Sequence, residues 1–93
     1  MKLARKYLIS GRVQGVGFRF FADHWATKLG LAGYVKNRWD GTVEAYAIGD
    51  EAALAEFKAR LAEGPRSARV DNIQESEEQV NHRYKRFVIE SDW

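Results

Sequence analysis

A chain of 93 residues, 45% of them hydrophobic, is long enough for one domain with a single buried core and too short for two. Its 15 basic and 13 acidic residues leave a net charge of +2, which excludes a general electrostatic attraction to nucleic acid or anionic lipid. Because the chain contains no cysteine, it has no disulfide, no thiolate nucleophile and no cysteine-based zinc site.

The start of the chain lacks the features of a targeting segment. Residues 1–6 include Lys2, Arg5 and Lys6, so they lack the apolar core of a signal peptide. No apolar run in the sequence approaches the length that spans a membrane. We therefore expect a soluble, cytoplasmic protein that does not act at a membrane.

The first predicted elements are a strand and a helix. Residues 4–13 alternate in character, which places Tyr7 and Ile9 on one face of a strand. Apolar residues recur at three- and four-residue spacing over residues 18–29, and this pattern indicates an amphipathic helix. Gly30 follows the last apolar residue of that series and is typical of a helix C-terminus.

A glycine-bearing turn joins this strand to this helix. Gly15 and Gly17 can adopt backbone conformations that other residues avoid, so consecutive N–H groups can point inward as a nest. The first turn of the helix adds unpaired N–H groups and the positive end of its dipole. Arg19 adds a planar guanidinium that matches two oxygens of one phosphoryl or carboxylate group. These features predict a small oxyanion site, with phosphate as the favoured ligand.

Two strands joined by a tight turn follow. Residues 31–38 and 42–48 both alternate in character, and the Asp40-Gly41 pair between them is typical of a hairpin. In the first of these strands, Asn37 follows the parity of the residues that face the core. Read alone, Asn37 is also compatible with an Asx turn before the Asp40-Gly41 pair.

The second half of the chain predicts one helix and two further strands. The helix has Asp50 as its N-cap and ends at the Gly64-Pro65 pair. Residues 68–75 indicate a weaker strand, because their apolar residues are out of phase and imply a bulge or an exposed edge. A polar connection over residues 75–83 leads to a last strand over residues 84–90.

The predicted order, β-α-β-β-α-β with a short final strand, indicates an α+β fold of the ferredoxin-like sandwich type. Two helices would cover one face of a mostly antiparallel sheet. Because crossovers between parallel strands are right-handed, the glycine turn and the end of the second strand should lie at the same end of the sheet. We therefore expect Asn37 to lie beside the glycine turn.

Two segments of the sequence resemble the two-part signature of the acylphosphatases. They are Gly11-Arg12-Val13-Gln14-Gly15-Val16-Gly17-Phe18-Arg19 and Gly33-Tyr34-Val35-Lys36-Asn37-Arg38-Trp39-Asp40-Gly41-Thr42-Val43-Glu44. The similarity covers the whole length, so it implies one acylphosphatase-like domain over residues 1–93. It also implies a hydrolase that splits the carboxyl–phosphate anhydride bond of small acyl phosphates, without a metal or other cofactor, and acts as a monomer.

The resemblance also implies roles for individual residues. By position in the signature, Arg19 would bind the phosphoryl group and Asn37 would hold the attacking water. The cradle around the phosphoryl group would consist of the main-chain amides of Gly15, Val16, Gly17, Phe18 and Arg19. The leaving group is a carboxylate whose acid has a pKa of about 4, so it departs without a general acid. Positioning and charge stabilisation then suffice for the reaction.

Two alternative interpretations belong to other functional classes. Residues 15–21 superficially resemble the aromatic RNA-binding motif of RRM domains, but that motif lies on the third strand, whereas this stretch follows the first. We therefore expect no nucleic-acid partner. Acylphosphatase-like domains also occur within larger proteins, such as carbamoyl-transferring hydrogenase maturation factors, which suggests a non-catalytic anion-binding module. A free-standing chain of this length argues against that role.

Neither His24 nor His82 has metal-ligand spacing with another residue, so no metal is expected.

Overall fold

The computed structural model describes residues 1–90, so residues 91–93 of the expected domain lie outside the described residues. The elements within this range are β1 (Leu3–Arg12), α1 (Phe18–Lys28), β2 (Ala32–Asn37), β3 (Val43–Gly49), α2 (Glu51–Glu63), β4 (Arg69–Glu78) and β5 (Phe87–Ile89). The predicted β-α-β-β-α-β order with a short last strand is confirmed.

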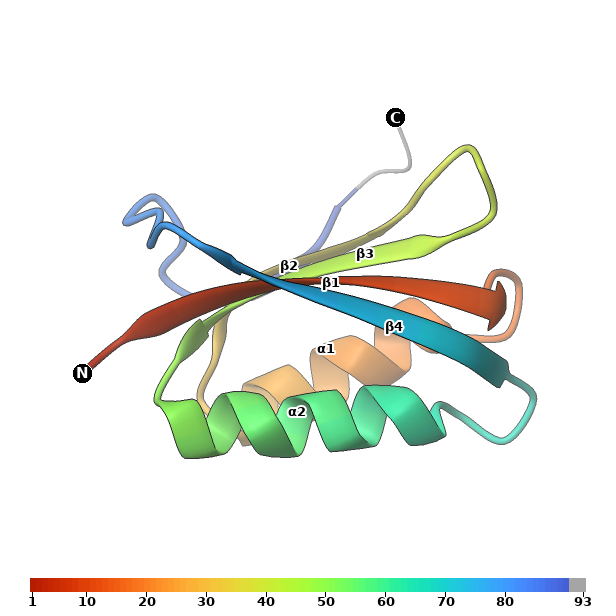
Figure 1. Ribbon diagram of the computed structural model, residues 1–93, viewed down its shortest axis with the longest axis horizontal. Helices are drawn as coiled ribbons and strands as arrows, with labels where there is room; N and C mark the ends of the chain where they lie inside the picture. The colour runs from red at the N-terminus through yellow and green to blue at the C-terminus, as the bar shows by residue number, and fades with distance from the viewer. Residues whose placement is uncertain (91–93) are drawn as a thin grey trace.

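The strands form a mixed sheet in the order β4-β1-β3-β2-β5. Neighbouring strands are antiparallel except for β2 and β5, which are parallel. Because β1 and β2 both run antiparallel to β3, they are parallel to each other and end at the same edge of the sheet. Figure 1 shows the orange turn after β1 and the yellow turn after β2 at one end of the molecule. The predicted ferredoxin-like topology is confirmed.

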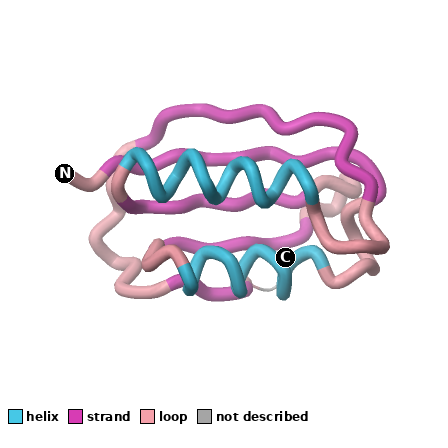
Figure 2. Tube along the Cα trace, turned by 90° about the horizontal axis from the view of Figure 1, so that it is seen from below, coloured by secondary structure: helices cyan, strands magenta, loops and turns pink. Residues whose placement is uncertain are grey.

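Both helices cover the same face of the sheet, and they lie side by side along the strands (Figure 1 and Figure 2). The alternation along β1 turns Tyr7 and Ile9 toward the helices, where both are fully buried. Each helix contributes an apolar stripe at three- and four-residue spacing. The buried residues of these stripes are Phe18, Ala22 and Ala26 of α1 and Leu54, Phe57 and Leu61 of α2. Burial of Phe18 fixes the first turn of α1 against the sheet.

Strand β4 lies at an edge of the sheet and carries the predicted irregularity. Ser10 of β1 pairs with Asn72 and Gly11 pairs with Val70, so Asp71 is an extra residue in the β4 register. The strand continues to Glu78, beyond the predicted end at residue 75, because its polar end still pairs with β1. Main-chain pairing along β1 therefore extends a strand that side-chain pattern alone would end earlier.

The face of the sheet away from the helices carries a smaller apolar cluster. The rings of Tyr34 and Tyr46 stack with their centroids 5.5 Å apart, and Tyr84 packs against both. Tyr84 belongs to the segment between β4 and β5, which lies over this face (Figure 1). The predicted start of the last strand at residue 84 is wrong. Tyr84 packs on the aromatic pair, and β5 begins only at Phe87.

Candidate active site

The turn after β1 holds two glycines in the left-handed region of backbone conformation. Gly15 has a φ of +73° and Gly17 has a φ of +79°. A Cβ atom added at either glycine would meet nothing within 4 Å. The backbone conformation, and not a lack of space, therefore favours glycine at both positions. Both glycines have the kind of conformation that the sequence predicts for a nest of N–H groups.

Helix α1 begins directly after Gly17, which occupies the N-cap position. The Phe21 N–H donates to the Gly17 carbonyl at 3.0 Å. The N–H groups of Phe18, Arg19 and Phe20, which precede Phe21, have no acceptor inside the helix. The first turn also contains no acidic side chain that would neutralise the positive end of the helix dipole. The N-terminus of α1 thus combines main-chain N–H groups, a positive potential and the guanidinium of Arg19.

Asn37 is the last residue of β2 and pairs with Val43 of β3. It shares the core-facing parity of Val35, and only 9% of Asn37 is exposed although its side chain is polar. An asparagine side chain can accept a hydrogen bond through its carbonyl and donate through its amide. The end of β2 therefore presents a nearly buried group that can orient a small polar molecule.

Arg19 and Asn37 line a single cavity of about 230 Å³ at this end of the sheet. The complete lining is Val13, Gly15, Gly17, Phe18, Arg19, Phe20 and Asn37. The structure brings five of the predicted site residues to this cavity: Gly15, Gly17, Phe18, Arg19 and Asn37. Val16, whose amide was also predicted to take part, is not among the lining residues, and its side chain packs against the core.

One apolar side chain of the cavity remains accessible to a ligand. Val13 and Phe18 are each 1% exposed and belong to the core, whereas Phe20 is 70% exposed. Trp39 is 85% exposed, but it is not among the residues that line the cavity. Of these aromatic groups, Phe20 is the one placed to contact the organic part of a bound molecule.

Gln14, which the sequence analysis did not single out, joins the two halves of the site. Its side-chain amide nitrogen donates to the carbonyl of Arg38 at 2.7 Å and to that of Thr42 at 2.9 Å. These partners lie 24 and 28 residues further along the chain. No local pattern in the sequence indicates such a contact, because it depends on the pairing of β1 and β2 with β3.

Side-chain hydrogen bonds to the carboxylates of Glu44 and Asp40 also hold the hairpin after Asn37. Arg38 Nη1 donates to Glu44 Oε1 at 2.8 Å, and the Tyr34 hydroxyl donates to the second oxygen of the same carboxylate. Burial alone would raise the pKa of Glu44, but these two hydrogen bonds outweigh it and hold the pKa below its ordinary value. Asp40 accepts hydrogen bonds from the N–H and hydroxyl of Thr42 within the turn. Glu44 and Asp40 thus support the hairpin.

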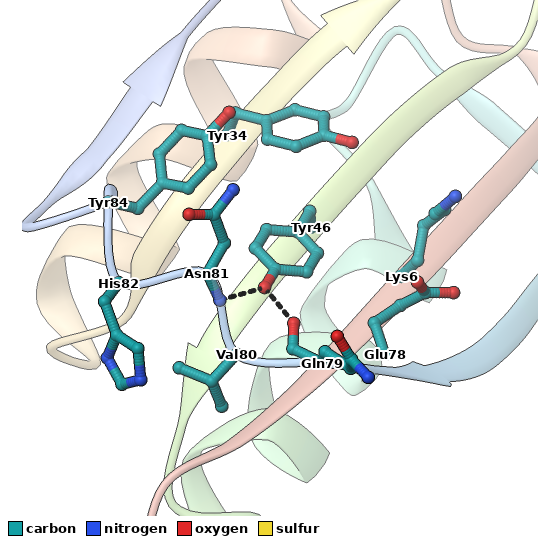
Figure 3. Close-up of a pocket in the computed structure, with 9 residues that line it drawn as sticks. All are labelled: Lys6, Tyr34, Tyr46, Glu78, Gln79, Val80, Asn81, His82 and Tyr84. Atoms are coloured by element: carbon teal, nitrogen blue, oxygen red, sulfur yellow. Dashed lines mark hydrogen bonds between the residues drawn. The ribbon is translucent and has the colours of Figure 1, made fainter.

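A larger cavity of about 570 Å³ lies on the face of the sheet that the helices do not cover (Figure 3). Figure 3 shows Tyr46 at its centre, where the hydroxyl donates to the Gln79 carbonyl at 2.5 Å and accepts from the Asn81 N–H at 2.9 Å. Tyr84 lines this cavity, and neither Arg19 nor Asn37 does. Its size therefore reflects how the segment between β4 and β5 lies over the tyrosines, away from the glycine turn.

The other residues that the sequence analysis considered are two phenylalanines, in the stretch that resembles an RRM motif, and two histidines. Phe20 and Phe21 lie on α1 and not on the open sheet face, unlike the aromatic residues of an RRM domain. His24 and His82 are exposed. Within residues 1–90, no group of three or more His, Asp or Glu side chains is placed to hold a metal ion. In the same range, none of the helices has the length and apolar character of a membrane span.

The fold and the cavity define a small ferredoxin-like protein with a candidate anion site at one end of its sheet, formed by a helix N-terminus and an arginine. A sequence model of the acylphosphatase family matches residues 5–89. The acylphosphatase of Koribacter versatilis is 48% identical over 89 residues, which cover 96% of this chain and 81% of that protein. The acylphosphatase of Actinobacillus succinogenes is 43% identical over 88 residues, which cover 95% of this chain and 98% of that protein.

Solved structures agree with these sequence relationships. The crystal structure of acylphosphatase from Bacillus subtilis superposes with a TM-score of 0.90 at 42% identity. The match covers 94% of this chain and 97% of that one. The chain belongs to the acylphosphatase family, as its two signature segments predict.

Proposed function

We propose that the cavity between the glycine turn and Asn37 is the catalytic site of this acylphosphatase. The observation that carries the proposal is that Arg19 and Asn37, from separate elements, line the same small cavity at a helix mouth. The substrate is a small acyl phosphate, and the products are a carboxylate and inorganic phosphate.

The phosphoryl group binds at the mouth of α1. The guanidinium of Arg19 contacts two phosphoryl oxygens at once, and the main-chain amides of residues 15–19 contact the others. These donors, with the positive end of the α1 dipole, supply the charge stabilisation for the transition state without a metal ion. The role of Gly15 and Gly17 is to let these amides converge on one group.

The reaction is an in-line attack of water on phosphorus. Asn37 holds the water by hydrogen bonds, opposite the oxygen that links phosphorus to the acyl group. A bond forms between the water oxygen and phosphorus while the anhydride P–O bond breaks, and the carboxylate leaves with the electron pair. A proton of the water passes to a phosphoryl oxygen. Because an ordinary carboxylic acid has a pKa of about 4, its anion departs without a proton donor.

The acyl group lies toward Phe20 at the rim of the cavity. Because Phe20 is 70% exposed beside Arg19, its ring can cover an apolar acyl group while the phosphoryl group is held inside. Residues 1–93 act as one domain, a cytoplasmic monomer with no nucleic-acid partner. The balanced net charge of +2 agrees with a preference for a small anion set by local groups.

Hydrolysis of benzoyl phosphate in the presence of EDTA tests this function. We expect release of benzoate and phosphate at a rate that EDTA does not change. When the reaction is run in water labelled with ¹⁸O, the label should enter phosphate and not benzoate, since the water attacks phosphorus. Unchanged substrate at high enzyme concentration would remove the catalytic reading, and label in benzoate would show attack at the carbonyl carbon instead.

A further inference from the structure

The amide of Gln14 contacts the hairpin on both sides of its turn. Asn37 is followed by Arg38, whose carbonyl accepts from Gln14 Nε2 at 2.7 Å. The carbonyl of Thr42, where the chain returns, accepts from the same nitrogen at 2.9 Å. Gln14 itself directly precedes Gly15. The residue just before the phosphoryl cradle is therefore hydrogen-bonded, through its side chain, to the residue just after Asn37.

Each of these carbonyls also has a partner within the hairpin. The Arg38 N–H donates to the Thr42 carbonyl at 2.8 Å, and the Gly41 N–H donates to the Arg38 carbonyl at 3.2 Å. A carbonyl oxygen can accept two hydrogen bonds, so Gln14 adds to the turn without displacing its own bonds. Because both partners are acceptors, the contact needs an NH₂ group, and a carboxylate of the same shape would be repelled by both.

We propose that Gln14 is a positioning residue that sets the place of Asn37 relative to the phosphoryl cradle. This inference rests on the function proposed for the cavity. In-line attack requires the water, phosphorus and leaving oxygen to be aligned, and a misplacement of about 1 Å can cost about 100-fold in rate. Asn37 and the cradle lie on separate segments, and Gln14 is a direct connection between those segments next to the reacting groups.

Three substitutions at Gln14 separate its hydrogen bonds from its bulk. Gln14→Ala and Gln14→Met should each lower kcat by about 10-fold, with Met keeping the length of the side chain but none of its donors. Gln14→Glu should lower kcat further, because its carboxylate faces two carbonyl oxygens. The inhibition constant of inorganic phosphate should change less than about threefold, since Val13 and Phe18 hold the cradle to the core. Gln74→Ala, on the exposed edge strand, is the matched control and should behave as wild type.

A double-mutant cycle with Asn37 tests whether Gln14 acts through that residue. In the Asn37→Ala background, Gln14→Met should lower kcat by less than about twofold, because the group that it positions is absent. A purely structural role would give the same fractional loss in both backgrounds. Additive losses, or a Gln14→Met kcat equal to that of wild type, would overturn the positioning role.

Amide hydrogen exchange gives a readout that does not depend on the reaction. In Gln14→Met, the N–H groups of Arg38 and Gly41 should exchange about 10-fold faster than in wild type, because the carbonyls that they bond lose their second partner. Exchange rates of these two amides that match wild type would contradict the bridge. If wild type itself fails to hydrolyse acyl phosphates, the proposed function falls, whereas active wild type with additive losses in the cycle removes only the role of Gln14.

Discussion

Arg19, on the first turn of α1, and Asn37, at the end of β2, line one cavity because β1, which leads into α1, runs parallel to β2. Strands β1 and β2 lie on either side of β3, and their C-terminal ends lie at the same end of the sheet. Arg19, which would bind the phosphoryl oxygens, and Asn37, which would hold the water, thus lie on separate elements. Each can be changed without removing the other.

Replacement of Arg19 should abolish both phosphate binding and turnover. Arg19→Ala removes the charged fork, and we expect kcat/KM to fall by about 1,000-fold or more, as for other arginines that stabilise phosphoryl transfer. Arg19→Lys should remain poor because a single ammonium cannot make the two parallel hydrogen bonds. Steady-state assays with benzoyl phosphate and inhibition by inorganic phosphate measure both effects. Arg83→Ala is the control, since Arg83 is exposed in the segment over the opposite face.

Replacement of Asn37 should separate binding from catalysis. In Asn37→Ala the cradle is intact, so the inhibition constant of phosphate should stay within about threefold, while kcat falls by about 100-fold. Asn72→Ala, on the exposed edge strand, should leave both quantities unchanged. Weaker phosphate binding with normal turnover in Asn37→Ala would reverse the roles assigned to Asn37 and Arg19.

Gly17 and Gly30 offer a matched pair for the cradle. They have φ values of +79° and +73°, and an added Cβ would meet nothing within 4 Å at either position. Alanine at either site should therefore lower the free energy of unfolding by about 1 kcal/mol, through backbone strain alone. Only Gly17→Ala should also weaken phosphate binding, because Gly30 lies at the other end of α1. Urea denaturation and phosphate inhibition, measured on both variants, check this difference.

Phe20 should set the preference for the acyl group. Full burial of a phenylalanine side chain contributes about 1.5–3 kcal/mol, so partial cover of an aromatic acyl group should be worth about 10-fold in kcat/KM. Phe20→Ala should lose that factor with benzoyl phosphate and little with acetyl phosphate. Trp39→Ala is the control, since Trp39 is exposed outside the cavity lining. Equal losses with both substrates would argue that Phe20 acts on the fold and not on the acyl group.

The Glu44 carboxylate should make the fold sensitive to acid. Its pKa lies below the ordinary 4.5, because hydrogen bonds from Tyr34 and Arg38 outweigh the effect of burial. The native state thus binds fewer protons than the unfolded state, and the stabilisation is present above pH 4.5 and lost as pH falls through the lowered pKa. In Glu44→Gln, urea denaturation at pH 6 and pH 3 should show a smaller difference in stability than in wild type. An unchanged difference would contradict the account of Glu44.

Much of the fold could be predicted because its signals are local. The alternation around Tyr7 and Ile9 and the helical spacing in residues 18–29 each report one buried face. The out-of-phase residues Val70 and Ile73 correctly indicated the irregular edge strand. The end of β4 and the start of β5 were misplaced, because main-chain pairing and the packing of Tyr84 decide them.

The site was predicted only in part, for a related reason. Gly15, Gly17 and Arg19 lie close together in the sequence, and the handedness of the crossover brings Asn37 to them. Gln14 depends on carbonyls 24 and 28 residues away, so its contacts could not be read before the strands were paired. The exposure of Phe20 at the rim likewise follows from how the first turn of α1 meets the sheet.

A crystal structure of the protein with inorganic phosphate bound tests the central claim most directly. We expect phosphate in the cavity of about 230 Å³, with the Arg19 guanidinium on two of its oxygens, amides of residues 15–19 on the others, and Asn37 facing the anion. Phosphate bound instead among the tyrosines of the opposite face, or an Asn37 side chain turned away from the anion, would contradict it.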